Sequence, residues 1–185
     1  MNNAVIFLAK GFEEIEAITV IDILRRADIN VTIAGLSSNI VEGGHSIMIV
    51  PDKTIDDINI DDFDVVIIPG GNPGVKNLRN DSRVIAFIKE AYKSGKIIAA
   101  ICAAPSVLSY AGILKEKNCT IYPGMEKELE KGGGKPKTDL VVIDGDIITS
   151  KGPATAMHFA LAIVEKLVGK EITESLRKNI LMNYL

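Results

Sequence analysis

The chain has 185 residues, of which 47% are hydrophobic, and this is enough to form one hydrophobic core. No Pro-, Gly- or Ser-rich linker divides it, so the sequence predicts a single domain over residues 1–185. The net charge is -3, with acidic and basic residues interspersed, which is not typical of a surface for nucleic acid or for an anionic membrane. We therefore expect neither nucleic acid nor a membrane as a partner.

Location and cofactors are also constrained by the sequence. The longest apolar runs, such as residues 97–102, are far shorter than a bilayer-spanning helix, and the first residues lack a charged signal-peptide lead. We therefore expect a cytoplasmic protein whose two cysteines, Cys102 and Cys119, are reduced thiols. No Cys-x-x-Cys or His-x-x-x-His spacing and no nucleotide-binding glycine fingerprint occurs. The sequence thus predicts neither a metal nor a cofactor.

Short apolar runs rich in Val and Ile alternate with amphipathic stretches along the chain. This pattern predicts an α/β fold, with a mostly parallel sheet covered by helices on both faces. In chain order, we predict a strand over 4–9, a helix over 14–27, a strand over 30–34, a hairpin of edge strands over 41–50, a strand over 64–68, a helix over 81–92, a strand over 97–101, a helix over 106–111, a strand over 120–122, a hairpin over 140–149, and helices over 154–167 and 171–181. We interpret residues 132–135 as a mobile loop.

The segments that follow the parallel strands are expected to gather at one edge of the sheet, where ligands bind in such folds. Three of them carry chemical groups: residues 10–16 after the first strand, residues 69–74 after the strand over 64–68, and the turn at Cys102. We expect these three loops to surround a common crevice.

Cys102 ends an apolar run and is followed by Ala103-Ala104-Pro105, which predicts a strand, a sharp turn and a helix with a thiol at the turn. Free N–H groups at a helix start favour a thiolate, so we expect a lowered pKa and a nucleophilic role for Cys102. A free cysteine in an apolar strand is, taken alone, more often structural, but the turn and the facing glycine loop favour the catalytic role. Cys119 is interpreted as an unreactive packing residue.

The other two loops supply complementary groups. The N–H groups of Gly70 and Gly71, together with that of Ala103, are predicted to form an oxyanion hole. Glu16 lies near the start of its helix and is expected to approach Cys102 with a raised pKa, so that it donates a hydrogen bond to the thiolate or shuttles a proton. Without that approach, Glu16 would belong to a solvated first turn that complements the helix dipole.

These residues lie in segments that resemble a known family. The chain is similar over essentially its whole length to the DJ-1/PfpI superfamily, specifically its DJ-1 (ThiJ-like) branch. The resemblance implies a flavodoxin-like three-layer sandwich that forms a homodimer, with Cys102 on a strained nucleophile elbow and Glu16 as its protonated partner. It also implies ready oxidation of Cys102 to a sulfinic acid held by Glu16. The segments that carry the resemblance are residues 8–16, 69–72, 98–105, 150–153 and 159–165.

One position departs from the family pattern. Where many relatives carry a histidine near the thiol, this chain has Tyr122 before Pro123. Tyrosine has a reference pKa of about 10 and is a poor base at neutral pH, although its hydroxyl can orient a substrate. For His45 and His158 a solvated or packing role is favoured, with His45 the better candidate because its hairpin could reach the crevice of a dimer neighbour.

The resemblance implies a thiol enzyme of the glyoxalase or deglycase type, acting on methylglyoxal or glycated adducts. In this hypothesis Cys102 attacks the carbonyl of a small substrate, Gly71 and Ala103 stabilise the oxyanion, and Glu16 moves the proton. A redox sensor or stress-protective chaperone is the alternative, because oxidation of the thiol needs no general base. A cysteine peptidase is disfavoured, because Tyr122 occupies the place of the expected base.

Overall fold

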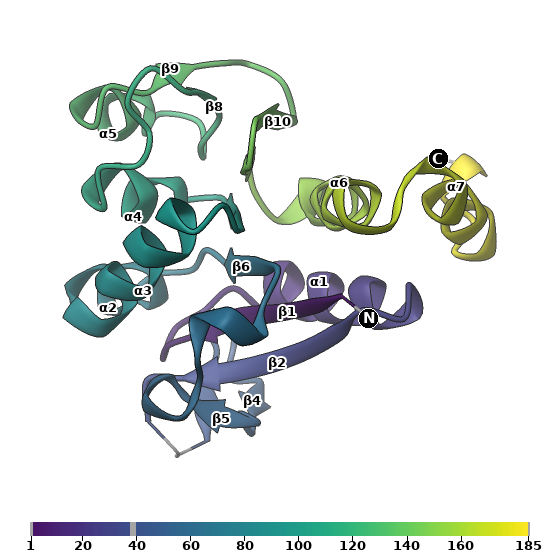
Figure 1. Ribbon diagram of the computed structural model, residues 1–185, viewed down its shortest axis with the longest axis horizontal. Coiled ribbons are helices and arrows are strands. Elements are labelled where there is room, and N and C mark those ends of the chain that lie inside the picture. Colours follow the sequence, from purple (N-terminus) through teal and green to yellow (C-terminus); the bar gives the residue numbers. More distant parts are fainter. Residues whose placement is uncertain (1, 38–39, 185) are drawn as a thin grey trace.

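The computed structural model describes residues 2–37 and 40–184 and has a seven-stranded sheet at its centre, in the order β10-β11-β7-β6-β1-β2-β5 (Figure 1). Neighbouring strands are parallel except β10, which is antiparallel to β11. The strands of this sheet are β1 (Asn3–Leu8), β2 (Asn30–Gly35), β5 (Lys53–Thr54), β6 (Val65–Ile68), β7 (Ile97–Ile101), β10 (Val141–Asp144) and β11 (Ile147–Ser150). Two small separate sheets pair β3 (Val41–Glu42) with β4 (Met48–Ile49) and β8 (Asn118–Cys119) with β9 (Lys135–Pro136).

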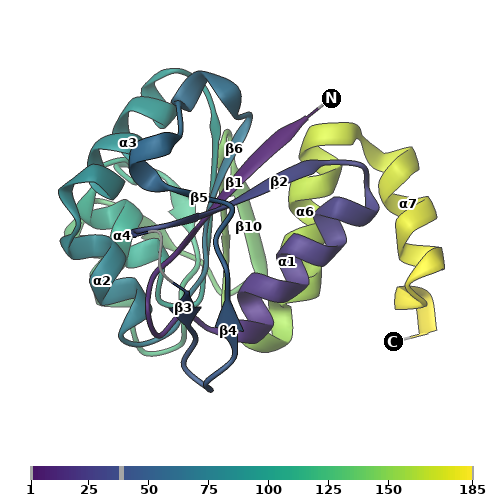
Figure 2. The ribbon, with the colours of Figure 1, turned by 90° about the horizontal axis from the view of Figure 1, so that it is seen from below.

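Helices cover both faces of the central sheet, as Figure 2 shows. On one side lie α1 (Glu14–Arg26) and α6 (Ala156–Val168), with α7 (Lys170–Asn179) packed outside α6. The other side carries α2 (Gly74–Asn80), α3 (Ser82–Lys93), α4 (Pro105–Tyr110) and α5 (Glu126–Lys131). Short 3-10 turns are η1 (Ile55–Asp57), η2 (Ile60–Asp62), η3 (Pro153–Thr155) and η4 (Met182–Tyr184). No helix in the described part of the chain has the length and hydropathy needed to span a bilayer.

The buried strands explain the continuous apolar runs of the sequence. Successive side chains of a strand point to opposite faces, so Ile6 and Leu8 of β1 pack toward α1 and α6, while Phe7 packs toward α2–α4. Phe7 meets Phe87 of α3 edge to face, with ring centroids 5.2 Å apart. Because both faces are buried, the central strands need apolar residues at every position rather than at alternate ones.

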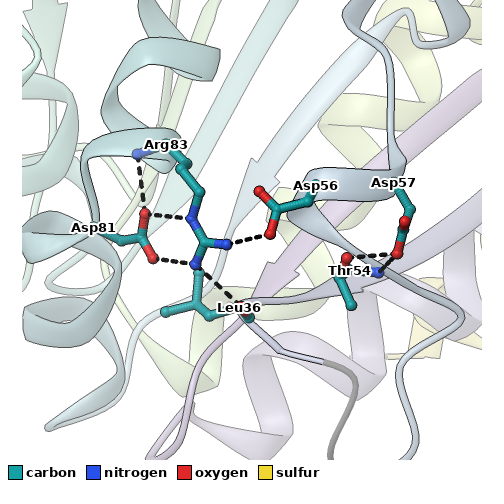
Figure 3. Close-up of polar contacts among 6 residues, drawn as sticks. All are labelled: Leu36, Thr54, Asp56, Asp57, Asp81 and Arg83. Carbon is teal, nitrogen blue, oxygen red and sulfur yellow. Dashed lines mark hydrogen bonds and ion pairs between the residues drawn. The ribbon is translucent and has the colours of Figure 1, made fainter.

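Arg83 fastens the start of α3 to two other parts of the chain (Figure 3). The Asp81 carboxylate caps α3 by accepting from the Arg83 N–H, and it also accepts from the guanidinium at 2.6 Å. The same guanidinium donates to Asp56 at 2.5 Å and to the Leu36 carbonyl at 3.1 Å. These contacts join α3 to η1 and to the chain that follows β2.

The structure confirms the predicted α/β class and most of the predicted elements, with three differences. The hairpin over 41–50 forms its own small sheet, and the edge of the central sheet is the unpredicted β5. The strand expected over 120–122 lies at 118–119 instead. Lys135, expected in a mobile loop, pairs with Asn118 in β9.

Two helices, α2 and α5, were not predicted. The six-residue helix α5 is almost entirely polar and buries only Leu129, so it has no apolar period to read. The seven-residue helix α2 begins with Gly74 directly after Pro73, and both residues usually indicate a turn. Short helices of this kind are stabilised mainly by the packing of a few side chains rather than by local propensity.

Candidate functional site

Cys102 sits at the sharp turn between β7 and α4 in a left-handed backbone conformation, with φ +64°. Its N–H donates to the Ser150 carbonyl at 2.9 Å, and its own carbonyl accepts from the Tyr122 N–H at 2.9 Å. A side chain at positive φ is strained, and such strain persists where surrounding contacts impose it. The end of β11 and the chain after β8 therefore hold this thiol, which is partly exposed, at the sheet edge.

Glu16 of α1 is completely buried and lies against the same turn. Its Oε2 accepts from the Gly70 N–H at 2.7 Å, whereas its Oε1 has no hydrogen-bond partner among the described residues. A Cβ atom placed on Gly70 would lie 2.4 Å from Glu16 Oε2 and 2.6 Å from the Cβ of Cys102. Gly70 thus touches both side chains, and only glycine fits between them.

The expected convergence of the three loops is confirmed. The Glu13 N–H donates to the Gly70 carbonyl at 2.9 Å, and the Gly74 N–H donates to the Gly11 carbonyl at 3.2 Å. Gly71 has φ +102°, and a Cβ there would lie 2.3 Å from the Gly11 carbonyl oxygen. Glycine is required at this point because the two loop backbones approach each other so closely.

Burial determines the charge state of Glu16. Removal from water raises the pKa of its carboxyl to about 7, although hydrogen bonds from Gly70 and Cys102 act in the opposite direction. The raised pKa expected from the sequence is therefore confirmed. A carboxyl that titrates near neutrality can accept and return a proton under physiological conditions.

The pKa of Cys102 moves opposite to the sequence-based expectation. Burial, and then the negative charge and hydrogen bond of Glu16, raise the thiol pKa to about 12, and only the Ala103 N–H contributes appreciably in the lowering direction. The prediction of a thiolate favoured by the helix start is wrong, because one backbone N–H does not outweigh burial beside a carboxylate. At neutral pH Cys102 keeps its proton, and Glu16 is the first of the two groups to ionise.

The three predicted oxyanion donors differ in availability. The Gly70 N–H is already used by Glu16, so its assignment to the oxyanion hole is wrong. The Gly71 N–H has no acceptor among the described residues, and the Ala103 N–H faces the sulfur of Cys102. Gly71 and Ala103 also line one cavity of about 270 Å³. Two backbone donors therefore border a space large enough for a small substrate.

Tyr122 contacts Cys102 through its backbone, its N–H donating to the Cys102 carbonyl at 2.9 Å, and its side chain is half-exposed. Its ring lies against Gly152, where an added Cβ would come within 3.5 Å of Tyr122 Cδ2. His158 is exposed on α6 and lines a different cavity, beside β10 and α7. Cys119 is fully buried, as predicted, and burial raises its thiol pKa to about 11.

His45 is held by α1 rather than by the thiol. Its Nδ1 lies 2.9 Å from Glu14 Oε2, and its backbone N–H donates to Glu14 Oε1 at 2.5 Å. Burial acts to raise the pKa of Glu14, but these hydrogen bonds outweigh it and lower the pKa, while the carboxylate raises the pKa of His45. Glu13, Glu14 and His45 are the described residues whose ligand atoms, within 4.8 Å of one another, could hold a metal ion.

Comparison with known proteins identifies the relatives of this chain. A family model described as DJ-1/PfpI matches residues 2–166. The chain belongs to the DJ-1/PfpI family. Within that family, protein dj-1beta of Drosophila melanogaster is 41% identical over 183 residues, which cover 98% of each chain, and this similarity places the chain in the DJ-1 branch.

Other DJ-1 relatives agree in sequence and fold. The glutathione-independent glyoxalase DJR-1.2 of Caenorhabditis elegans is 43% identical over 166 residues, covering 90% of this chain and 88% of that protein. The crystal structure of Drosophila DJ-1beta matches with a TM-score of 0.92 over 97% of both chains at 41% identity. The structure titled Toxoplasma gondii DJ-1, oxidized, matches with a TM-score of 0.92 over 98% of both chains at 32% identity. The expected flavodoxin-like fold of the DJ-1 family is confirmed.

The sequence reasoning missed the residues that form the far wall of the cavity beside Cys102. Lys76 and Arg79 of α2 line this cavity, as does the buried Ser106 of α4. Because the sequence did not predict α2, it did not predict that Lys76 and Arg79 lie near the site. Their spacing of three residues directly after the glycine loop is the signal that could have found them, because it puts both on one face of a helix.

Proposed function

We propose that this DJ-1 family member is a cysteine-dependent enzyme that converts reactive carbonyls such as methylglyoxal into hydroxy acids. Cys102 is the nucleophile and Glu16 the proton carrier. The observation that carries the proposal is the buried Glu16 carboxyl, which has a pKa of about 7 and meets Cys102 at Gly70. The Caenorhabditis elegans relative named a glutathione-independent glyoxalase supports it.

The first step is addition of sulfur to the aldehyde carbon. As the carbon–sulfur bond forms, the thiol proton passes to the Glu16 carboxylate, which removes the need for a preformed thiolate at a pKa of about 12. The carbonyl electron pair moves to oxygen, where the N–H groups of Gly71 and Ala103 stabilise the charge. Glu16 then returns the proton to this oxygen, and the product is a hemithioacetal.

The second step is an internal oxidation and reduction. Glu16 takes the proton from the carbon bonded to sulfur and delivers it to the neighbouring carbon, while the hydroxyl proton moves to the oxygen of that second carbon. The first carbon is oxidised to a thioester and the second is reduced to an alcohol, so no external oxidant is needed. Water then cleaves the thioester, the sulfur regains a proton, and lactate is released from methylglyoxal.

Tyr122 has a smaller part in this proposal. Its backbone is hydrogen-bonded to Cys102, and we assign its hydroxyl to orienting the substrate, while proton transfer falls to Glu16. A glycated adduct enters the same addition step once its carbon–nitrogen bond breaks, the amine leaves with a proton and the aldehyde is restored, and this sequence covers a deglycase activity. A cysteine peptidase would need a base that also protonates an amine leaving group, and His45 is engaged with Glu14 instead.

The test measures lactate formed from methylglyoxal by the purified, reduced protein. We expect Cys102→Ser to abolish turnover and Glu16→Gln to lower it by about a hundredfold or more. Cys119→Ser is the matched control, because it removes the other thiol, which is fully buried in β8, and it should retain activity. Lactate formation that survives in Cys102→Ser, or its absence from the wild type, contradicts the proposal.

A redox-sensing role is the second candidate, and the unpartnered Oε1 of Glu16 favours it. Below a pH of about 7 the carboxyl carries a proton that it can donate to an oxidised sulfur. Peroxide would convert the thiol to a sulfenic acid and water, and a second equivalent would give the sulfinic acid. Intact mass after graded peroxide treatment tests this role. Cys102 that resists doses oxidising exposed model thiols rules it out.

We also propose the homodimer and the cytoplasmic location expected for this branch. Exposed apolar side chains on α1 and near the β3–β4 hairpin support an interface between two copies, namely Ile15, Ile18, Ile47 and Met48. Sedimentation at micromolar concentration should give twice the chain mass, and a monomer contradicts the dimer. Cell fractionation tests the location.

A further inference from the structure

The cavity beside Cys102 has a cationic wall. Lys76 and Arg79 of α2 line it on one side, and Gly71 and Ala103, the proposed oxyanion donors, line it on the other. Its volume of about 270 Å³ exceeds what a three-carbon aldehyde needs. The cavity that the two proposed oxyanion donors border is therefore also bordered by two positive charges.

These two cations are unpaired among the described residues. Other basic side chains on the face of the sheet that carries α2–α5 form ion pairs, as Arg83 does with Asp81 and Lys131 with Glu128. Lys76 and Arg79 form neither an ion pair nor a hydrogen bond among the residues that the structure describes, although Arg79 is half-buried. An unpaired guanidinium at a cavity wall is the group that commonly binds carboxylate or phosphate.

Charge is also distributed along the cavity in a way that orients a ligand. Glu13 and Glu16 place negative charge near Cys102, the residue before the lining residue Ala103, and the cations stand on α2. An anionic group is repelled from the sulfur end and attracted to the α2 wall. A substrate with a carbonyl at one end and an anion at the other would bind with its carbonyl toward Cys102.

We propose that Lys76 and Arg79 form an anion subsite, so that the preferred substrates are small aldehydes or ketoaldehydes that carry a carboxylate or phosphate group. This inference rests on the proposed function, since it names the substrate class of the same site. Neutral methylglyoxal then fills only the part of the cavity next to the thiol.

The test compares two alkylating reagents that differ in charge, iodoacetate and iodoacetamide, on Cys102 in a Cys119→Ser background. The ratio of their rates cancels the fraction of thiolate, and it needs no turnover. We expect the ratio of iodoacetate to iodoacetamide to be about three- to tenfold higher in the wild type than in K76Q/R79Q. Raising the salt to 1 M, where the Debye length is about 3 Å, should bring the two ratios together.

The matched control is K93Q/K170Q, which removes the same charge away from the cavity, from the ends of α3 and α7. We expect it to keep the wild-type ratio, and R79K to keep most of it. The salt dependence of the wild type alone gives a second measurement that requires no variant to fold. Equal ratios in the wild type and K76Q/R79Q, or a wild-type ratio insensitive to salt, overturn the anion subsite.

Protection of Cys102 from alkylation distinguishes phosphate substrates from carboxylate substrates. Glycerol 3-phosphate, glycerate and glycerol are compared for their ability to slow iodoacetamide at Cys102. Protection by glycerol 3-phosphate alone indicates phosphate substrates, and protection by glycerate alone or by both indicates carboxylate substrates or both classes. Protection by neither anion overturns the proposal. If the charge preference is found but methylglyoxal gives no lactate, the proposed function fails while the subsite stands.

Discussion

The backbone N–H of Gly70 donates to Oε2 of Glu16 at 2.7 Å, and this contact fixes the buried carboxyl beside Cys102. It also uses the amide that would otherwise face a substrate oxygen. The glycine loop therefore anchors the proposed proton carrier through Gly70, and Gly71 is the proposed oxyanion donor from this loop.

The first prediction concerns the effect of Glu16 on the thiol. Glu16→Gln removes the negative charge that helps to raise the thiol pKa, so the pKa of Cys102 should fall but stay above the cysteine reference of about 8.5 because the site is still buried. The alkylation rate of Cys102 against pH, in a Cys119→Ser background, measures this. An unchanged or higher pKa would mean that Glu16 stabilises the thiolate by donating to it.

The second prediction concerns the pH dependence of turnover. If Glu16 accepts the thiol proton, its carboxylate is the active form, and kcat/KM for methylglyoxal should rise with a midpoint at a pH of about 7. Well below the midpoint the increase should be about tenfold per pH unit. A rate that falls through this range would instead identify the protonated carboxyl as the active form.

The third prediction concerns stability against pH. The pKa of Glu16 rises from 4.5 to about 7 on folding, so its contribution to stability is fully present below pH 4.5 and is lost as the pH rises through about 7. The Glu16→Gln side chain cannot ionise. Its free energy of unfolding, relative to that of the wild type, should therefore increase by about 3 kcal/mol between pH 4.5 and pH 8. Urea unfolding at both pH values measures the difference.

The matched control for this measurement is Glu130→Gln, the same chemical change on an exposed residue of α5. A stability gain of Glu16→Gln that is the same at pH 4.5 and pH 8 would show that Glu16 does not titrate in this range when folded.

The fourth prediction concerns the space between Glu16 and Cys102. The added methyl group of Gly70→Ala would lie 2.4 Å from Glu16 Oε2 and must displace one of the two side chains. We expect kcat/KM to fall by about a hundredfold and the free energy of unfolding by about 1–3 kcal/mol. Gly44→Ala is the control, since its nearest neighbour is at 3.6 Å. Equal activity in both variants would show that the contact at Gly70 is not needed.

Much of the site could be predicted because local patterns position it. Apolar runs marked the central strands, and parallel strands bring the loops after them to one edge. Cys102 at a strand–helix turn and Glu16 in the first turn of α1 followed from this arrangement. The pattern did not reveal α2, whose short and polar sequence has little apolar period, and so Lys76 and Arg79 were missed.

The sequence by itself determined which residues reach the sheet edge, because continuous apolar runs and the turns that follow them are properties of the local chain. Only the tertiary structure decided the protonation of Cys102 and Glu16 and which amide is free. A pKa depends on burial and on charges a few ångströms away, and those neighbours come from α1, β6 and β7, which are distant in sequence. The same packing that buries Glu16 keeps the proton on Cys102, so that proton transfer between the two replaces a preformed thiolate in the proposed chemistry.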